Sequence, residues 1–233
     1  MVKERKAGII GVYGKGPEFT TGQAVKCFEL ISWLQDRYGP EQIMVVNTWR
    51  WKRNPIRLMV RSAEAFLFCK NVLMLPAQNG IRVFAPLCFL GKKLTGKPVH
   101  YVVIGGWLGD FLRQHPFMKR LVAAFDGVYV ETKAMVDQLE ELGLTNTVYL
   151  PNFRKTSKEK PVAEVFPFQS NAPLKVCTYS RVVKEKGIED GIRIVRRANE
   201  KLGHMAFRLD IYGRVAREYE GEFQKILETN QDL

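Results

Sequence analysis

The sequence predicts an α/β protein built on a parallel β-sheet. Short runs of apolar and β-branched residues alternate with longer stretches whose apolar residues recur at helical spacing. The alternation runs through most of the 233 residues, and connections of this length form right-handed strand–helix–strand units. It is interrupted by residues 153–173, which contain prolines and show no periodicity. We therefore expect one complete Rossmann-like domain, a linker and a partial second Rossmann-like domain.

The first domain is expected to span residues 1–152. Its strands are predicted at 7–13, 43–47, 71–75, 98–104, 127–131 and 147–150. Its helices are predicted at 21–38, 55–69, 80–94, 110–124 and 132–142. The last helix is the best marked, because Thr132 can cap its first turn and Gly143 can end it.

After the linker, the same pattern resumes in residues 174–233. Strands are predicted at 174–179 and 207–212, and helices at 187–202 and 216–229. Two strands and two helices form only the first part of a doubly wound domain. Such a piece would bury a small core and leave a long sheet edge exposed.

The cysteines and the apolar runs exclude several protein classes. No apolar run approaches the ~18 residues needed to cross a bilayer, and the first residues lack the long apolar region of a secretory signal. Cys27, Cys69, Cys88 and Cys177 lie far apart, without a CxxC motif or a nearby histidine pair. We expect reduced thiols in a cytoplasmic protein, and no metal site.

The positive charge is concentrated in the first half of the chain. Residues 1–120 contain 19 Lys and Arg against 7 Asp and Glu, and the remaining residues contain 17 of each, so the first half carries the whole net charge of +12. The densest cluster mixes basic residues with tryptophans, as in a contact with an anionic membrane surface. The predicted membrane contact consists of Trp49, Arg50, Trp51, Lys52, Arg53 and Arg57.

Two other interpretations compete with the membrane contact. A solvated helix face whose apolar side lies in the core would give the same pattern. Nucleic acid also attracts basic domains, but the sequence contains no zinc-finger, KH or RNP motif, so we expect no nucleic-acid partner.

The loop after the first strand, GVYGKG at residues 11–16, is a candidate phosphate contact. Glycines let the backbone approach a phosphate, and the N-terminus of the next helix supplies free N–H groups. The loop does not match a dinucleotide fingerprint, because Phe19 stands where the third glycine belongs and the second strand ends in Asn47 rather than a carboxylate. It also lacks the Gly-Lys-Ser/Thr of a Walker loop.

A second candidate is YSRVVKEKGI at residues 179–188. Here a strand ends, a basic loop follows and Gly187 opens a helix. Arg181 and Lys186 at the carboxyl end of a parallel strand would form an anion site where open α/β sheets bind ligands. A solvated loop with a chance cluster of charges is the alternative.

These features together resemble the retaining GT-B glycosyltransferases, and most closely their glycosyltransferase group 1 type. The shared features are the Gly-rich first turn, GVYVET at 127–132, TVYLPN at 147–152, the linker and the Ser-Arg…Lys-Gly opening of the second domain. The resemblance implies a GT-B-like fold whose first domain binds an acceptor and whose second binds a nucleotide diphosphate sugar. It implies that Arg181 and Lys186 hold the donor pyrophosphate, that Gly14 and Gly16 approach the same phosphates, and that no cofactor is needed.

The chain departs from that family at two places. The family often carries a histidine after the fourth strand, where this sequence reads IGGW at 104–107, while His100 is expected inside the strand and His115 inside the next helix. The family's two spaced glutamates are matched by Glu220 and Glu228, which we interpret as solvated charges on an amphipathic helix. The true pair is expected beyond Leu233.

The resemblance therefore implies sugar transfer to a lipid-linked glycan in cell-surface polysaccharide synthesis. The protein would act in the cytoplasm, at the inner face of the membrane. The alternative is an inactive binding module, either truncated or completed by a separate chain that supplies the missing C-terminal part.

Overall fold

The computed structural model describes residues 4–16, 19, 21–154 and 172–231. The chain divides into two compact units, Met1–Lys158 and Glu159–Leu233. The boundary falls within the stretch 153–173 interpreted as a linker, of which residues 155–171 lie outside the described residues.

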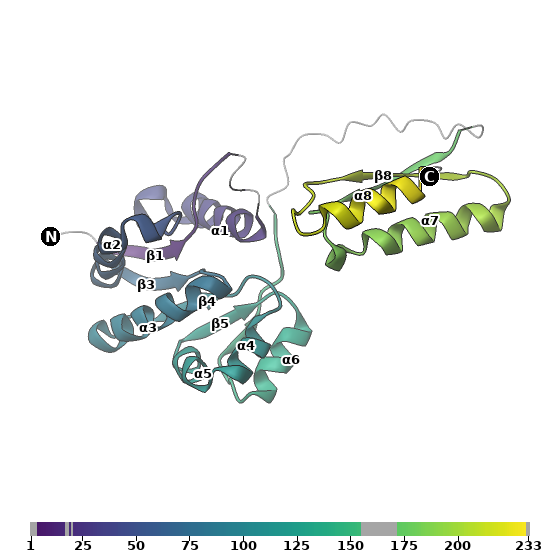
Figure 1. Cartoon of the computed structure of the whole chain (residues 1–233). Helices are drawn as coiled ribbons and strands as arrows, with labels where there is room; N and C mark the ends of the chain where they lie inside the picture. Colours follow the sequence, from purple (N-terminus) through teal and green to yellow (C-terminus); the bar gives the residue numbers. More distant parts are fainter. Residues whose placement is uncertain (1–3, 17–18, 20, 155–171, 232–233) are drawn as a thin grey trace. The chain divides into compact units, whose positions relative to one another are not determined.

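The first unit is built on a six-stranded parallel sheet with the strand order β2-β1-β3-β4-β5-β6 (Figure 1). The strands are β1 (Arg5–Gly11), β2 (Ile43–Asn47), β3 (Cys69–Met74), β4 (Val99–Val102), β5 (Gly127–Val130) and β6 (Thr147–Tyr149). The expected α/β fold with a Rossmann-like parallel sheet is thus confirmed for this unit.

Helices cover both faces of this sheet. They are α1 (Gly22–Tyr38), α2 (Pro55–Phe68), α3 (Gln78–Thr95), α4 (Leu108–Gln114), α5 (Pro116–Ala123) and α6 (Lys133–Glu141). Short 3-10 turns, η2 (Pro40–Gln42) and η3 (Trp51–Arg53), precede β2 and α2.

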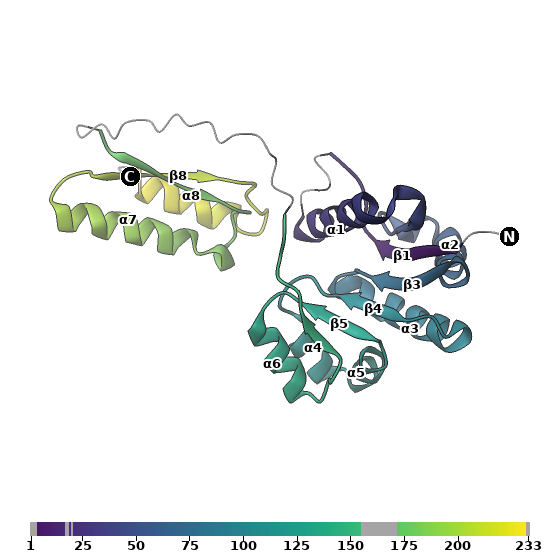
Figure 2. The same ribbon diagram turned by 180° about the vertical axis from the view of Figure 1, so that it is seen from behind.

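The core has two parts because successive strand residues point to opposite faces. Ile10 packs in the larger cluster with side chains of α2 to α6, whereas Ile9 packs with Cys27 and Ile31 of α1. The helix α1 thus lies on one face and the other helices lie on the opposite face, as the reverse view also shows (Figure 2).

The prediction of a single helix at 110–124 is wrong, because the structure has two helices there. Pro116 cannot donate a backbone hydrogen bond, so α4 ends before it and α5 begins at it. His115 lies between the two helices rather than inside one. Its ring stacks on Phe111 with 4.2 Å between centroids.

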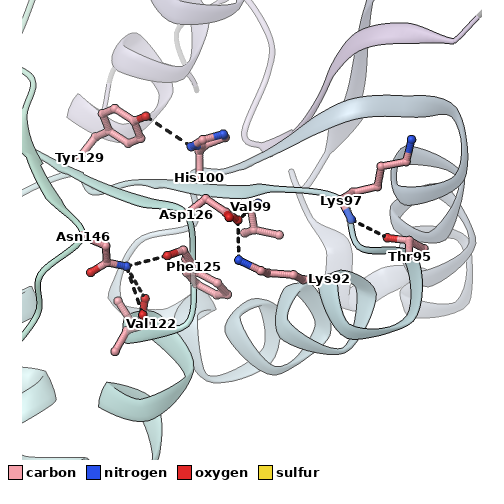
Figure 3. Close-up of polar contacts among 11 residues, drawn as sticks. Lys92, Thr95, Lys97, Val99, His100, Val122, Phe125, Asp126, Tyr129 and Asn146 are labelled. Atoms are coloured by element: carbon pink, nitrogen blue, oxygen red, sulfur yellow. Dashed lines mark hydrogen bonds and ion pairs between the residues drawn. The ribbon is translucent and has the colours of Figure 1, made fainter.

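Polar side chains fasten the amino-terminal ends of β4 and β5 (Figure 3). Asp126 accepts hydrogen bonds from Lys92 Nζ at 2.6 Å and from the backbone N–H of Val99 at 2.7 Å. Burial raises the pKa of Asp126, but these two hydrogen bonds outweigh it and hold the pKa below its ordinary value. Asn146 donates to three backbone carbonyls, those of Val122, Ala123 and Phe125.

The second unit pairs two parallel strands, β7 (Leu174–Tyr179) and β8 (Phe207–Tyr212). Around them lie the short turn η4 (Lys184–Lys186) and the helices α7 (Ile188–Leu202) and α8 (Glu220–Thr229). The last helix begins four residues later than expected at 216, because the chain first forms a turn at 216–219. A small core joins Val182, Ile188, Ile192, Tyr219 and Phe223.

Among the helices that the structure describes, none has both the length and the apolar character needed to cross a bilayer. Of the cysteines, Cys27, Cys69 and Cys88 are buried and Cys177 is exposed, and all four are free thiols. Burial raises the pKa of Cys27 and of Cys88 to about 12.

Candidate functional site

The glycine-rich loop lies at the carboxyl end of β1, held by Asn47 at the end of β2. The Asn47 amide donates to the carbonyl of Tyr13 at 2.7 Å and accepts from the N–H of Tyr13 at 3.1 Å and of Trp49 at 2.9 Å. Sequence reasoning noted only that Asn47 is not the carboxylate of a dinucleotide site. In the structure it ties the loops after β1 and β2 together.

The two glycines predicted to contact phosphate have local structural roles. At Gly14, a Cβ atom would clash with the ring of Phe19, so a side chain fits only if that ring moves. Gly16 has a φ of +117°, a value that favours glycine. These constraints account for both glycines locally, and their contact with phosphate stays a prediction.

A buried ion pair at the carboxyl edge of the same sheet was not predicted from the sequence. Lys26 of α1 lies 2.8 Å from Glu131, which follows β5, and the two side chains are 6% and 14% exposed. Lys26 Nζ also donates to the carbonyl of Val103, while the second carboxylate oxygen of Glu131 accepts from the N–H of Gly105 at 3.3 Å. The pair therefore joins α1, the end of β5 and the loop after β4.

That loop, IGGW at 104–107, stands where the resemblance would place a histidine. Gly105 has a φ of +84°, and the Trp107 indole donates to the carbonyl of Ile104 at 2.8 Å. The loop contains no side chain that could transfer a proton near pH 7. Its backbone is held by the carboxylate of Glu131 instead.

The two histidines considered in the sequence analysis contact neighbouring side chains and backbone of the first unit. His100 lies in β4, as expected, and its Nδ1 lies 3.3 Å from the hydroxyl of Tyr129 (Figure 3). Burial lowers the pKa of His100. His115 lies 2.8 Å from the carbonyl of Phe111 through Nδ1 and 3.2 Å from Arg82 through Nε2.

The second candidate loop lies at the carboxyl end of β7, in the second unit. Arg181 follows the strand and Lys186 ends η4, directly before Gly187, the N-cap residue of α7. Both side chains are exposed. Gly187 has a φ of +68° and gives the helix no side-chain cap, so the first N–H groups of α7 keep their hydrogen-bonding capacity.

Some of the charged side chains around this loop form ion pairs or hydrogen bonds with neighbouring side chains. Lys184 lies 2.9 Å from Glu222, and Glu189 accepts a hydrogen bond from the hydroxyl of Tyr219 at 3.0 Å. In the part of the chain that the structure describes, Arg181 and Lys186 make no ion pair. The loop therefore presents two uncompensated cations at the end of a parallel strand, which suits an anion.

The residues of the predicted membrane contact do not share one environment. Lys52, Arg53 and Arg57 are exposed. The ring of Trp49 lies 4.8 Å from that of Phe19 and 5.5 Å from the guanidinium of Arg50.

The second tryptophan of that contact, Trp51, points inward. Its ring lies partly buried at the edge of the main core, 5.8 Å from the ring of Phe84. Any lipid contact at this cluster therefore depends on other side chains.

A cavity of about 520 Å³ opens on the face of the sheet that carries α1. It is lined by Trp33, Leu34, Leu73, His100 and Tyr129, among others. None of the predicted phosphate or membrane residues lines it. The two glutamates considered in the sequence, Glu220 and Glu228, are exposed on α8, in agreement with solvated charges.

The predicted phosphate residues thus fall into two groups, one in each unit. Gly14 and Gly16 lie in the loop after β1, and Arg181 and Lys186 lie in the loop after β7. Among the described residues, no group of three or more His, Cys, Asp or Glu side chains could hold a metal ion. No protein-family model matches this chain, and no curated protein matches it.

Proposed function

We propose that this chain has a GT-B-like organisation and takes part in transferring a sugar from a nucleotide diphosphate sugar to a glycan acceptor. The observation that supports the proposal is the pair of exposed cations at the end of β7, Arg181 and Lys186, next to the uncapped start of α7. A pyrophosphate is an anion of the size and charge that such a loop can hold.

The proposed role of these two side chains is electrostatic. In a retaining transfer the departing phosphate can take the proton of the acceptor, so the protein need not supply a carboxylate base. Arg181 and Lys186 would then stabilise the negative charge that develops on the pyrophosphate as the glycosidic bond breaks. Gly14 and Gly16 are proposed as additional backbone contacts to phosphate.

The acceptor is proposed to be lipid-linked, in a pathway that builds cell-surface polysaccharide. The protein would then work in the cytoplasm at the inner face of the membrane. The net charge of +12, carried by the first half of the chain, supports attraction to a surface of anionic lipid.

The alternative is a binding module without activity of its own, either a truncated form or a subunit completed by another chain. The small sheet of the second unit favours this alternative, because it has two strands among the described residues. Apolar and aromatic side chains of this sheet, such as Val176, Tyr179 and Tyr212, are exposed. A sheet of this size with exposed apolar side chains suits a partner that packs against it.

Assays of nucleotide-sugar turnover separate the two functions. We expect weak or undetectable hydrolysis and transfer by this chain alone, because Glu220 and Glu228, which match the family's two glutamates in spacing, are solvated charges on α8. Detectable turnover that disappears in Arg181→Ala would establish an enzyme. Nucleotide binding without turnover would establish the binding module.

A further inference from the structure

The helix α2 has a second apolar face, which points away from the core. Leu58, Ala65 and Phe66 are buried against the sheet. A separate stripe follows at positions three, four and eleven residues after Ile56, a spacing that places it on one face of a helix. The exposed stripe consists of Ile56, Met59, Val60 and Leu67, and Ile56 is 75% exposed.

The neighbouring helix α3 repeats this arrangement. The two helices lie side by side, because the ring of Phe66 occupies the space beside Gly91. On α3 the exposed apolar residues are Val83, Leu90 and Leu94, at heptad-like spacing, and Leu94 is 77% exposed. We refer to the two exposed stripes together as the α2–α3 surface.

The charge around this surface has one dominant sign. Within the bounds of α2, α3 and α5 the sequence contains seven basic residues and a single acidic one, Glu64. Glu64 is ion-paired with Arg61, and Lys92 is ion-paired with Asp126, which follows α5. The basic residues are Arg57, Arg61, Arg82, Lys92, Lys93, Lys119 and Arg120.

We propose that the α2–α3 surface docks on an anionic lipid bilayer, with its aliphatic side chains among the headgroups and its basic residues against the lipid phosphates. The charge complementarity points to an anionic partner, and the aliphatic stripes point to one with an apolar interior. Nucleic acid fits less well, because bases stack on aromatic rings rather than on Ile, Met and Leu side chains.

This inference rests on the membrane location in the proposed function but not on sugar transfer. It also assigns the lipid contact to the α2–α3 surface instead of the cluster of basic residues and tryptophans predicted from the sequence. Trp51 packs against Phe84 and lies outside the α2–α3 surface, whereas Arg57 remains part of it.

Sedimentation with vesicles tests the proposal without any nucleotide sugar. We expect the chain to sediment with phosphatidylglycerol-containing vesicles and not with pure phosphatidylcholine vesicles. The charge variant R57Q/K93Q/R120Q should bind the anionic vesicles about a hundredfold more weakly, since each basic residue near the surface contributes separately. The apolar variant I56Q/M59Q/L94Q should lose the binding that persists at high salt.

Two matched controls distinguish this surface from the rest of the chain. W33Q/Y38Q removes exposed aromatic residues from α1, on the opposite face of the sheet, and R193Q/R197Q/K201Q removes three charges from α7. Both should bind vesicles like the unchanged chain. Equal losses in the controls, equal binding to neutral vesicles, or no binding would overturn the proposal. So would a dimer in solution that the apolar variant converts to a monomer.

A fluorescent label reports whether this surface touches the lipid. With Cys177, the exposed cysteine, changed to Ser, the variants Leu94→Cys and Tyr38→Cys each offer one exposed thiol. An environment-sensitive fluorophore at position 94 should shift to shorter wavelength on anionic vesicles, and one at position 38 should not. A shift at position 38 alone would show that another face binds the bilayer.

Discussion

Replacing Lys26 by Met should strongly destabilise the first unit. Methionine has a similar length and helix propensity, so the change removes the charge with little effect on α1 itself. It leaves the carboxylate of Glu131 buried, with a hydrogen bond from the N–H of Gly105 but no cation beside it. We expect the free energy of unfolding of this unit to fall by about 3–5 kcal/mol.

The size of the effect follows from the geometry of the pair. At 2.8 Å the attraction between the two charges is about 6 kcal/mol at an effective dielectric constant of about 20. In the intact pair, the cost of removing both groups from water offsets most of this attraction. Without Lys26 the attraction is lost, while the cost of burying Glu131 remains.

Tryptophan fluorescence during urea unfolding measures this change for the first unit alone. All four tryptophans, Trp33, Trp49, Trp51 and Trp107, belong to Met1–Lys158. The signal therefore excludes the second unit, which need not unfold together with the first.

A matched substitution and a double variant complete the test. Lys97→Met breaks a pair with Glu4 whose side chains are 26% and 40% exposed, and it should cost much less stability than Lys26→Met, because water screens this pair. Lys26→Met combined with Glu131→Gln should recover much of the loss, because no buried charge remains unpaired. A Lys26→Met variant no less stable than Lys97→Met would refute the reasoning.

Three further changes test the first unit. Burial lowers the pKa of His100 in the folded chain. As the pH falls through about 6.5, the ordinary histidine pKa, the unfolded chain therefore binds more protons than the folded chain. The free energy of unfolding should accordingly fall between about pH 7.5 and about pH 5.5. His100→Gln should reduce this fall, and an unchanged pH profile would contradict the argument. Thr132→Ala should cost about 1 kcal/mol in urea unfolding, because Thr132 caps α6. Asn47→Ala should speed hydrogen exchange at the amides of Tyr13 and Trp49, and equal rates would show that Asn47 does not hold these loops.

The order of strands and helices could be predicted because hydrophobic periodicity is a local signal. The helix α6 is the clearest case, since Thr132 accepts a hydrogen bond from the N–H of Met135 at 3.2 Å and Gly143 has a φ of +82°. The split between α4 and α5 was missed although Pro116 marks it. The apolar pattern continues across the proline and conceals the break.

The contacts that organise the carboxyl edge of the sheet could not be predicted in the same way. Lys26 and Glu131 are 105 positions apart, and neither residue type signals a buried partner. Trp51 alternates with basic residues and looks solvated in the sequence. In the structure Arg50 takes a left-handed φ of +51°, and the turn η3 that follows brings Trp51 back to the core.

Titration of the intact chain with UDP and GDP, compared with Arg181→Ala/Lys186→Ala, tests the proposed function most directly. We expect weak binding that the double variant reduces by at least about tenfold, because each charge-assisted contact contributes about 1.5–3 kcal/mol. The variant should keep its fold, since both side chains are exposed. Nucleotide binding of equal strength in the two proteins would contradict an anion site at the end of β7, and with it the proposed donor site.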